Sequence, residues 1–173
     1  MKSLSLAIIF IITILVQSNV DSAEIALKTQ KMECRNCLVR FEDGALSIVH
    51  FFDNEKMQQL KKLQALGYMQ GSNDYAAQLV IPYTFTGNEA TVRLALSYVV
   101  ESKEAMQYII IGLVDESNRD ISMERISPEK YMDAVKNNAY LSARLKTLSR
   151  KRGAIVLKFA GIKYIRISKI AID

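Results

Sequence analysis

Alternating hydrophobic and polar residues dominate the chain from about residue 77 onward, and this spacing predicts β-strands. Turn residues separate segments that each fit one strand, at 77–85, 90–100, 106–114, 121–126, 141–148, 154–160 and 162–172. Pro82 indicates an edge or a bulge in its strand, because proline cannot donate to a ladder. Upstream, residues 38–52 predict two strands that are interrupted near Asp43-Gly44.

The strand over residues 90–100 shows the alternation most clearly. One face would carry Val92, Leu94, Leu96 and Tyr98, and the other Arg93, Ala95 and Ser97. We therefore expect Tyr98 to share a face of its strand with Val92, Leu94 and Leu96.

Two segments have the spacing of helices instead. Met57, Leu60, Leu63 and Leu66 recur every three residues and predict a short helix near 54–66. Ser127 followed by Pro128 is a typical helix start and predicts a second helix near 128–137. A competing interpretation continues this helix to residue 150, but Asn137-Asn138 and the alternation after them favour a strand there.

About eight strands, joined by short turns and accompanied by one or two short helices, predict an all-β fold. The expected architecture is a mostly antiparallel β-sandwich or jelly roll, formed as one domain by residues 38–173. Half of the residues are hydrophobic and 24% are charged, as in globular proteins.

The N-terminus has the layout of a secretory signal peptide. Lys2 precedes an uncharged apolar run over 4–16 and a polar stretch over 17–22, with cleavage expected near Ser22/Ala23. We expect the signal peptide to be residues 1–22 and the mature protein to be secreted or periplasmic, without a stable membrane span. A retained anchor is the alternative, although a span needs about 20 apolar residues.

Cys34 and Cys37 are the only cysteines, in a segment over 23–37 that precedes the main domain. In an oxidising compartment such a pair is expected to form a disulfide. A redox site or a metal site is the alternative for Cys-x-x-Cys. Zinc needs four ligands, however, and His50 is the only histidine.

Positive charge is concentrated at the C-terminal end. From residue 141 onward nine Lys and Arg residues stand against Asp173, which leaves a local charge of +8 within a net charge of +5. If consecutive strands pair, Arg144, Lys146, Lys158 and Arg166 gather on one sheet face. Such a face would attract an anionic glycan or surface polymer outside the cell, rather than nucleic acid. The alternative is an ordinary solvated sheet surface.

From about residue 71 to residue 173 the chain contains, in order, QLVIPYTFTGNEATVRLALSYVV, MQYIIIGLV, LSARLKTL, AIVLKFAG and IKYIRISKIAID. This order of segments is similar to that of galactose-binding-like jelly rolls, a group that includes many non-catalytic carbohydrate-binding modules. Gly161 and Ile165-Arg166-Ile167 occupy the places of the glycine and the closing Ile-x-Ile strand. The resemblance implies a sugar ligand. Because the chain has no tryptophan, Tyr140 and Tyr164 are the expected aromatic contacts beside the four cations.

Catalytic patterns are missing from the sequence. His50 lies among apolar residues, no Gly-x-Ser-x-Gly motif occurs, and the glycines form no phosphate loop. Residues 115–120 resemble a calcium loop faintly but are better read as a hairpin turn. We therefore expect no enzyme, cofactor or metal, and predict a secreted glycan-binding module. The alternative is a structural or accessory subunit of a cell-surface or secretion assembly that acts through a protein partner; a hydrolase is the third hypothesis.

Overall fold

The computed structural model describes residues 23–50, 76–103, 106–117, 119–147 and 151–173. The predicted signal peptide over 1–22 and the predicted helix near 54–66 lie outside the described residues. Within these ranges no helix is both long and apolar enough to cross a membrane.

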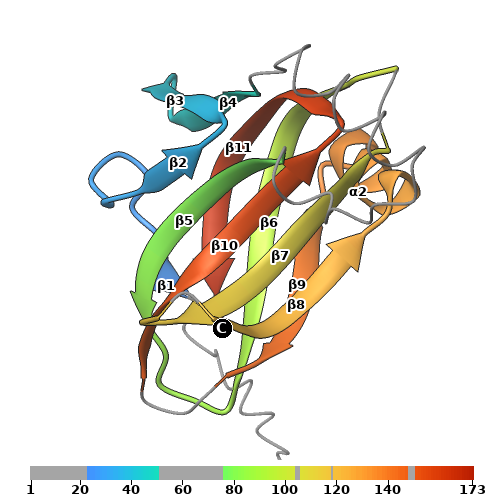
Figure 1. Cartoon of the computed structure of the whole chain (residues 1–173). Helices are drawn as coiled ribbons and strands as arrows, with labels where there is room; N and C mark the ends of the chain where they lie inside the picture. The colour runs from blue at the N-terminus through green and yellow to red at the C-terminus, as the bar shows by residue number, and fades with distance from the viewer. Residues whose placement is uncertain (1–22, 51–75, 104–105, 118, 148–150) are drawn as a thin grey trace, which may run out of the picture.

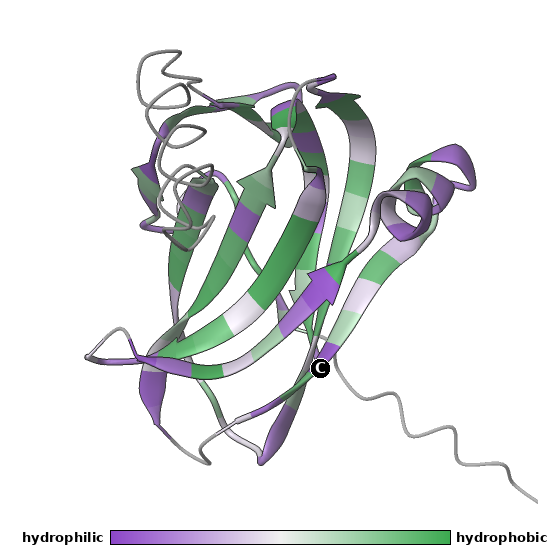
Figure 2. Ribbon diagram, turned by 45° about the vertical axis from the view of Figure 1, so that its right-hand side comes forward, coloured by the Kyte–Doolittle hydropathy of each residue, from purple (hydrophilic) through white to green (hydrophobic). Residues whose placement is uncertain are grey.

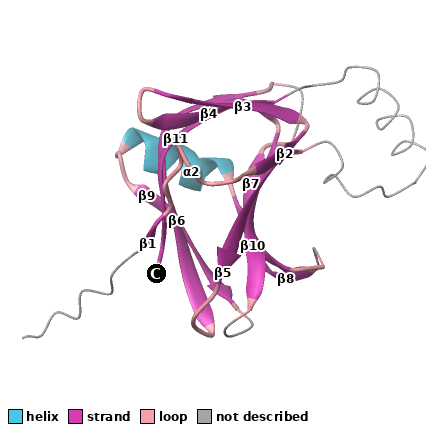
Figure 3. Ribbon diagram, turned by 90° about the vertical axis from the view of Figure 1, so that its left-hand side faces the viewer, coloured by secondary structure: helices cyan, strands magenta, loops and turns pink. Residues whose placement is uncertain are grey.

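Two antiparallel sheets form the described part of the chain (Figures 1 and 3). The first is six-stranded, in the order β3-β4-β11-β6-β9 with β1 also on β11; its strands are β1 (Ala23–Glu24), β3 (Cys37–Glu42), β4 (Ala45–His50), β6 (Glu89–Glu101), β9 (Tyr140–Lys146) and β11 (Ile162–Ile172). The second is five-stranded, in the order β2-β5-β10-β7-β8; its strands are β2 (Glu33–Arg35), β5 (Ala77–Thr84), β7 (Tyr108–Asp115), β8 (Asp120–Ile126) and β10 (Arg152–Ala160). The all-β sandwich prediction is confirmed.

The hydrophobic core lies between the sheets, where alternate strand residues meet. Central strands supply fully buried side chains such as Leu79, Ile111 and Leu157 from one sheet and Leu94 and Ile167 from the other. Figure 2 shows the resulting alternation of hydrophobic and hydrophilic residues along the ribbons. Burial of apolar side chains at these positions is the main force that holds the layers together.

Helix α2 (Pro128–Lys136) confirms the prediction for residues 128–137. Tyr131 of this helix is fully buried, and its hydroxyl donates to the Glu101 carboxylate at the end of β6. The helix ends at Asn137, and Asn138 adopts a left-handed φ of 51° before β9 begins. The strand after this turn rules out the competing helix to residue 150.

The turn between β3 and β4 agrees with its sequence in detail. Asp43 and Gly44 both have positive φ, at 48° and 73°, between the paired residues Glu42 and Ala45. This is the type I′ geometry for which Asp-Gly is preferred, because it matches the twist of the two strands. Pro82 lies at an edge, as predicted. On that side of β5 the pairing with β2 reaches only as far as Val80, so no ladder partner needs a proline N–H.

The expectation that the consecutive strands after residue 141 pair with one another is wrong. β9 and β11 belong to the six-stranded sheet with β6 between them, whereas β10 lies at the centre of the other sheet. Consecutive strands therefore cross between layers instead of pairing. The sequence pattern specifies which residues alternate, but it carries no information about which of two sheets a strand joins.

Candidate ligand-binding face

The outer face of the six-stranded sheet carries the most exposed aromatic pair of the described residues. Along β11 the buried Ile165 and Ile167 point inward, so Tyr164 and Arg166 point outward. Register places Arg166 between Ser47 of β4 and Tyr98 of β6. We call Ser47, Tyr98, Tyr164 and Arg166 the tyrosine patch.

A β-bulge brings Tyr98 to this face. The register between β6 and β11 shifts so that Tyr98 opposes Arg166 while Leu96 opposes Ile167, which leaves Ser97 as an extra residue. The Ser97 hydroxyl donates to the Arg166 carbonyl at 3.4 Å. As a result Tyr98 is 55% exposed, and the prediction that it shares the face of Leu94 and Leu96 is wrong. Bulges re-aim side chains in this way.

The two tyrosine rings are arranged as a tilted pair. Their centroids lie 5.8 Å apart and their planes meet at 60°. The Tyr164 hydroxyl shares a 3.0 Å hydrogen bond with the buried Ser47 hydroxyl, which fixes the orientation of the ring. The pair offers a pre-positioned apolar surface with polar groups at its border.

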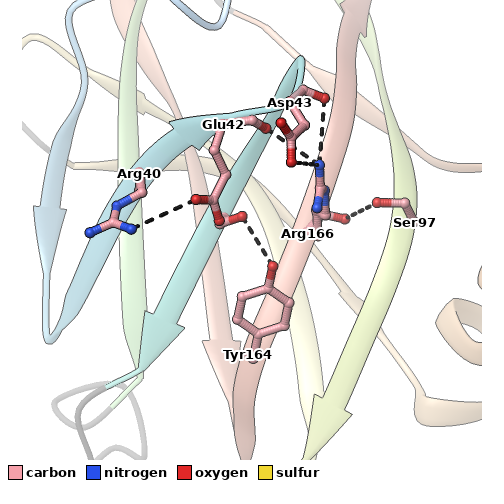
Figure 4. Close-up of polar contacts among 7 residues, drawn as sticks. Arg40, Glu42, Asp43, Ser97, Tyr164 and Arg166 are labelled. Carbon is pink, nitrogen blue, oxygen red and sulfur yellow. Dashed lines mark hydrogen bonds and ion pairs between the residues drawn. The ribbon is translucent and has the colours of Figure 1, made fainter.

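Arg166 is anchored to the β3–β4 turn rather than extended into solvent. Its guanidinium donates to the carbonyls of Glu42 at 3.4 Å and Asp43 at 3.5 Å, and lies 3.7 Å from the Asp43 carboxylate. Arg40 and Glu42 form a second ion pair beside it, at 3.7 Å (Figure 4). Charged donors and acceptors thus alternate along this side of the patch.

The other predicted site residues are not brought together. Tyr140, Arg144 and Lys146 lie on β9, at the opposite edge of the same sheet. Lys158 lies on the outer side of the other sheet, between Gln78 and Ile110, and is only 9% exposed. A single basic face formed by Arg144, Lys146, Lys158 and Arg166 is therefore wrong, because the strands that carry them do not neighbour one another.

Acidic residues pair with three of the cations on this sheet. Arg144 donates to Glu89 at 2.8 Å, Arg93 pairs with Asp173 at 2.7 Å, and Lys169 pairs with Glu24 at 2.6 Å. The Glu24 carboxylate also raises the pKa of Lys169. The local charge of +8 in the sequence is consequently dispersed in the fold.

The two cysteines are free thiols in the structure, so the expected disulfide is not formed there. Cys34 belongs to β2 of one sheet and Cys37 to β3 of the other, and Asn36 between them has a φ of 57°. The Cys34 thiol points to the Cys37 carbonyl at 3.5 Å. Burial, and then the neighbouring Cys34, raise the pKa of Cys37 to about 11.

Polar residues considered for other chemistry have structural roles. The buried His50 ring makes a 3.2 Å hydrogen bond from Nδ1 to the Ile162 carbonyl, as expected of a histidine in a sheet. The Asp115 carboxylate accepts hydrogen bonds from the backbone N–H groups of Arg119 and Ser117. These bonds lower the pKa of Asp115, and the Arg119 N–H has the largest effect. This closes the hairpin turn as predicted. Across the described ranges, no group of three or more His, Cys, Asp and Glu residues could hold a metal ion.

No protein-family model and no curated protein sequence matches the chain. Solved structures of similar fold include a lysine-to-alanine variant of the family 29 carbohydrate-binding module CBM29-2 in complex with cellulohexaose, which is 14% identical with a TM-score of 0.47. The match covers 88% of this chain and 92% of the CBM29-2 chain. An aspartate-to-alanine variant of CBM29-2 is 13% identical over 82% of this chain and 78% of that one, with a TM-score of 0.45.

PfGH50B is 10% identical to this chain, with a TM-score of 0.47. The match covers 88% of this chain and 23% of PfGH50B. At these values the similarity concerns the arrangement of the strands and assigns no ligand or residue role.

Proposed function

We propose that this protein is a secreted, non-enzymatic carbohydrate-binding protein that holds a glycan on the tyrosine patch. The tilted Tyr98–Tyr164 pair beside an anchored arginine carries the proposal. Tyr98 is 55% exposed, and Tyr164 is partly buried. Aromatic faces stack on the apolar C–H faces of sugar rings, and the polar groups around them satisfy the hydroxyls.

The charge arrangement favours an uncharged glycan over an anionic polymer. Arg166 and Arg40 each have a carboxylate within 4 Å, from Asp43 and Glu42. An arginine beside a carboxylate supplies both donors and acceptors, which suits the hydroxyl groups of a neutral sugar. A polyanion would have to compete with the existing carboxylates for the same guanidinium groups.

Isothermal titration with neutral and sulfated oligosaccharides tests the proposal. Tyr98→Ala is expected to weaken binding of a neutral glycan by about tenfold or more, because a buried aromatic contact of this kind is worth about 1–3 kcal/mol. Tyr140→Ala is the matched control, since it removes a similarly exposed tyrosine from the other edge of the same sheet. We expect that variant to bind within about twofold of the parent.

Equal losses in the two variants would contradict a site at the Tyr98–Tyr164 pair. Binding of sulfated glycans alone would contradict the preference for neutral sugars. If no glycan binds and a defined protein copurifies with the chain, the accessory-subunit alternative is favoured instead.

A further inference from the structure

β3 is an edge strand whose outer side pairs with no strand of the described chain. Among the other edges, β2 is only three residues long, and β8 carries a register shift and lies against β9. The Lys146 N–H of β9 donates to the Ser122 hydroxyl of β8 at 3.3 Å, which closes that side of the sandwich. β3, in contrast, runs for six residues in unbroken register with β4.

The turn geometry determines which backbone groups of β3 point outward. Glu42 and Ala45 flank the two-residue turn and therefore form a hydrogen-bonded pair. Because such pairs alternate along a hairpin, Arg40 and Leu38 also direct their N–H and C=O groups toward β4. Cys37, Val39 and Phe41 must then direct theirs away from the sheet, where no strand of the described chain pairs with them. The Cys37 carbonyl already accepts the Cys34 thiol at 3.5 Å, and a backbone N–H of a second copy would share or replace this contact.

The side chains along this edge do not protect it. Leu38 is 60% exposed and Phe41 is 37% exposed, and the strand contains no lysine or proline. Natural proteins commonly protect a free edge with such residues or with a bulge. Arg40 and Glu42 pair with each other, so the strand carries no net charge that would repel a second copy.

We propose that β3 pairs antiparallel with β3 of a second copy of this chain, about a two-fold axis at Val39. Across this axis Val39 faces Val39 of the second copy, and Cys37 faces Phe41. The outward N–H and C=O groups of these three residues can then form up to about six backbone hydrogen bonds between the two copies. Leu38 then lies opposite Arg40 of the second copy, so the aliphatic part of the arginine covers the exposed leucine. An axis at Arg40 would instead place two arginines against each other.

Pairing of β3 with a second copy does not depend on the proposed function but has a consequence for it. A two-fold axis normal to the sheet keeps both outer faces on the same side. The two tyrosine patches would then lie on one continuous sheet surface. A dimer of this geometry could engage one polysaccharide at two points, which raises its avidity without new contacts.

Sedimentation velocity of the full chain at a series of concentrations tests the pairing. Leu38→Lys places a lysine opposite Arg40 of the other copy at two symmetry-related positions. We expect this repulsion to weaken dimerisation by about tenfold or more. Val49→Lys is the matched control: it puts the same charge on the same face, one strand further in. We expect Val49→Lys to leave dimerisation unchanged.

The double variant Leu38→Lys/Arg40→Glu tests the register, because it restores an opposite-charge pair only when residues 38 and 40 face each other. Recovery of the dimer supports the axis at Val39. A parent that sediments as a monomer at all concentrations would overturn the proposal, as would equal losses for Leu38→Lys and Val49→Lys, which indicate contact through the sheet face. Circular dichroism of each variant confirms that the fold is retained.

Discussion

Ser97 is a single residue that decides whether the chain has an exposed aromatic pair. Without the extra residue, the alternation from Val92 to Leu96 would carry Tyr98 into the core. The bulge instead places the ring beside Tyr164 and Arg166. A bulge depends on the partner strand, so a period of two in one sequence segment cannot reveal it.

Arg166 and Lys158 lie on opposite sides of the sandwich, and this separates their roles. Arg166→Gln removes the guanidinium that ties the tyrosine patch to the turn, so we expect glycan affinity to fall by about tenfold. Lys158→Gln changes a nearly buried position on the other sheet and should leave affinity within about twofold. Titration calorimetry of both variants measures this. Equal loss in both would indicate that the ligand does not sit on the tyrosine patch.

Two glycines with similar φ differ in what surrounds them. Gly44, at a φ of 73°, has open space where a Cβ would lie, so Gly44→Ala should lower the free energy of unfolding by only about 1 kcal/mol. Gly161, at a φ of 64°, would place a Cβ 2.7 Å from the Met106 carbonyl oxygen. Gly161→Ala should therefore cost clearly more, because backbone must move. Urea denaturation of the two variants gives the comparison, and a smaller loss at Gly161 would contradict it.

Burial of the Cys37 thiol predicts a pH dependence of stability. Its pKa rises from 9.0 to about 11 in the folded chain, because burial and the nearby Cys34 disfavour the thiolate. The unfolded chain therefore loses this proton first, and the free energy of unfolding should fall as pH rises from about 9 toward 11. Cys37→Ala should flatten that part of the profile in reducing buffer. An unchanged slope in the variant would assign the effect to other groups.

At the scale of elements, hairpins and caps are the features that the sequence specifies well. Asp43-Gly44 marks a type I′ turn, and Ser127-Pro128 marks the start of α2, because both depend on local backbone preferences. The two short strands β1 and β2 carry no such signal. They exist because β11 and β5 offer them a partner.

A partly buried hydrogen bond that the sequence does not reveal joins helix α2 to the end of β6. The Tyr131 hydroxyl donates to Glu101, and burial together with this carboxylate raises the pKa of Tyr131 above its usual value. Tyr131→Phe leaves the carboxylate without this donor, so we expect a loss of about 1–3 kcal/mol in the free energy of unfolding. Thermal and urea unfolding measure it. Met132→Ala, at an exposed position of the same helix, is the control and should cost less than about 1 kcal/mol.

At the scale of the whole molecule, the sequence predicts the fold class but not the grouping of charge. Nine cations after residue 141 suggest one basic face, yet their strands divide between two sheets. Glu24 of β1, Glu89 at the start of β6 and the C-terminal Asp173 then pair with Lys169, Arg144 and Arg93. Only the three-dimensional pairing of strands decides which charges meet.

This dispersed charge predicts how salt affects binding. If neutral sugars bind through aromatic stacking and hydrogen bonds at the tyrosine patch, affinity should change by less than about twofold between about 0.05 and 1 M NaCl, although the Debye length shortens to about 3 Å. Retention on a heparin-like matrix, in contrast, should be weak and lost at low salt, because Arg93, Arg144 and Lys169 already have carboxylate partners. Affinity electrophoresis in a neutral polysaccharide and ion-dependent elution from heparin measure the two responses. Strong heparin retention together with salt-sensitive glycan binding would restore the hypothesis of an anionic ligand.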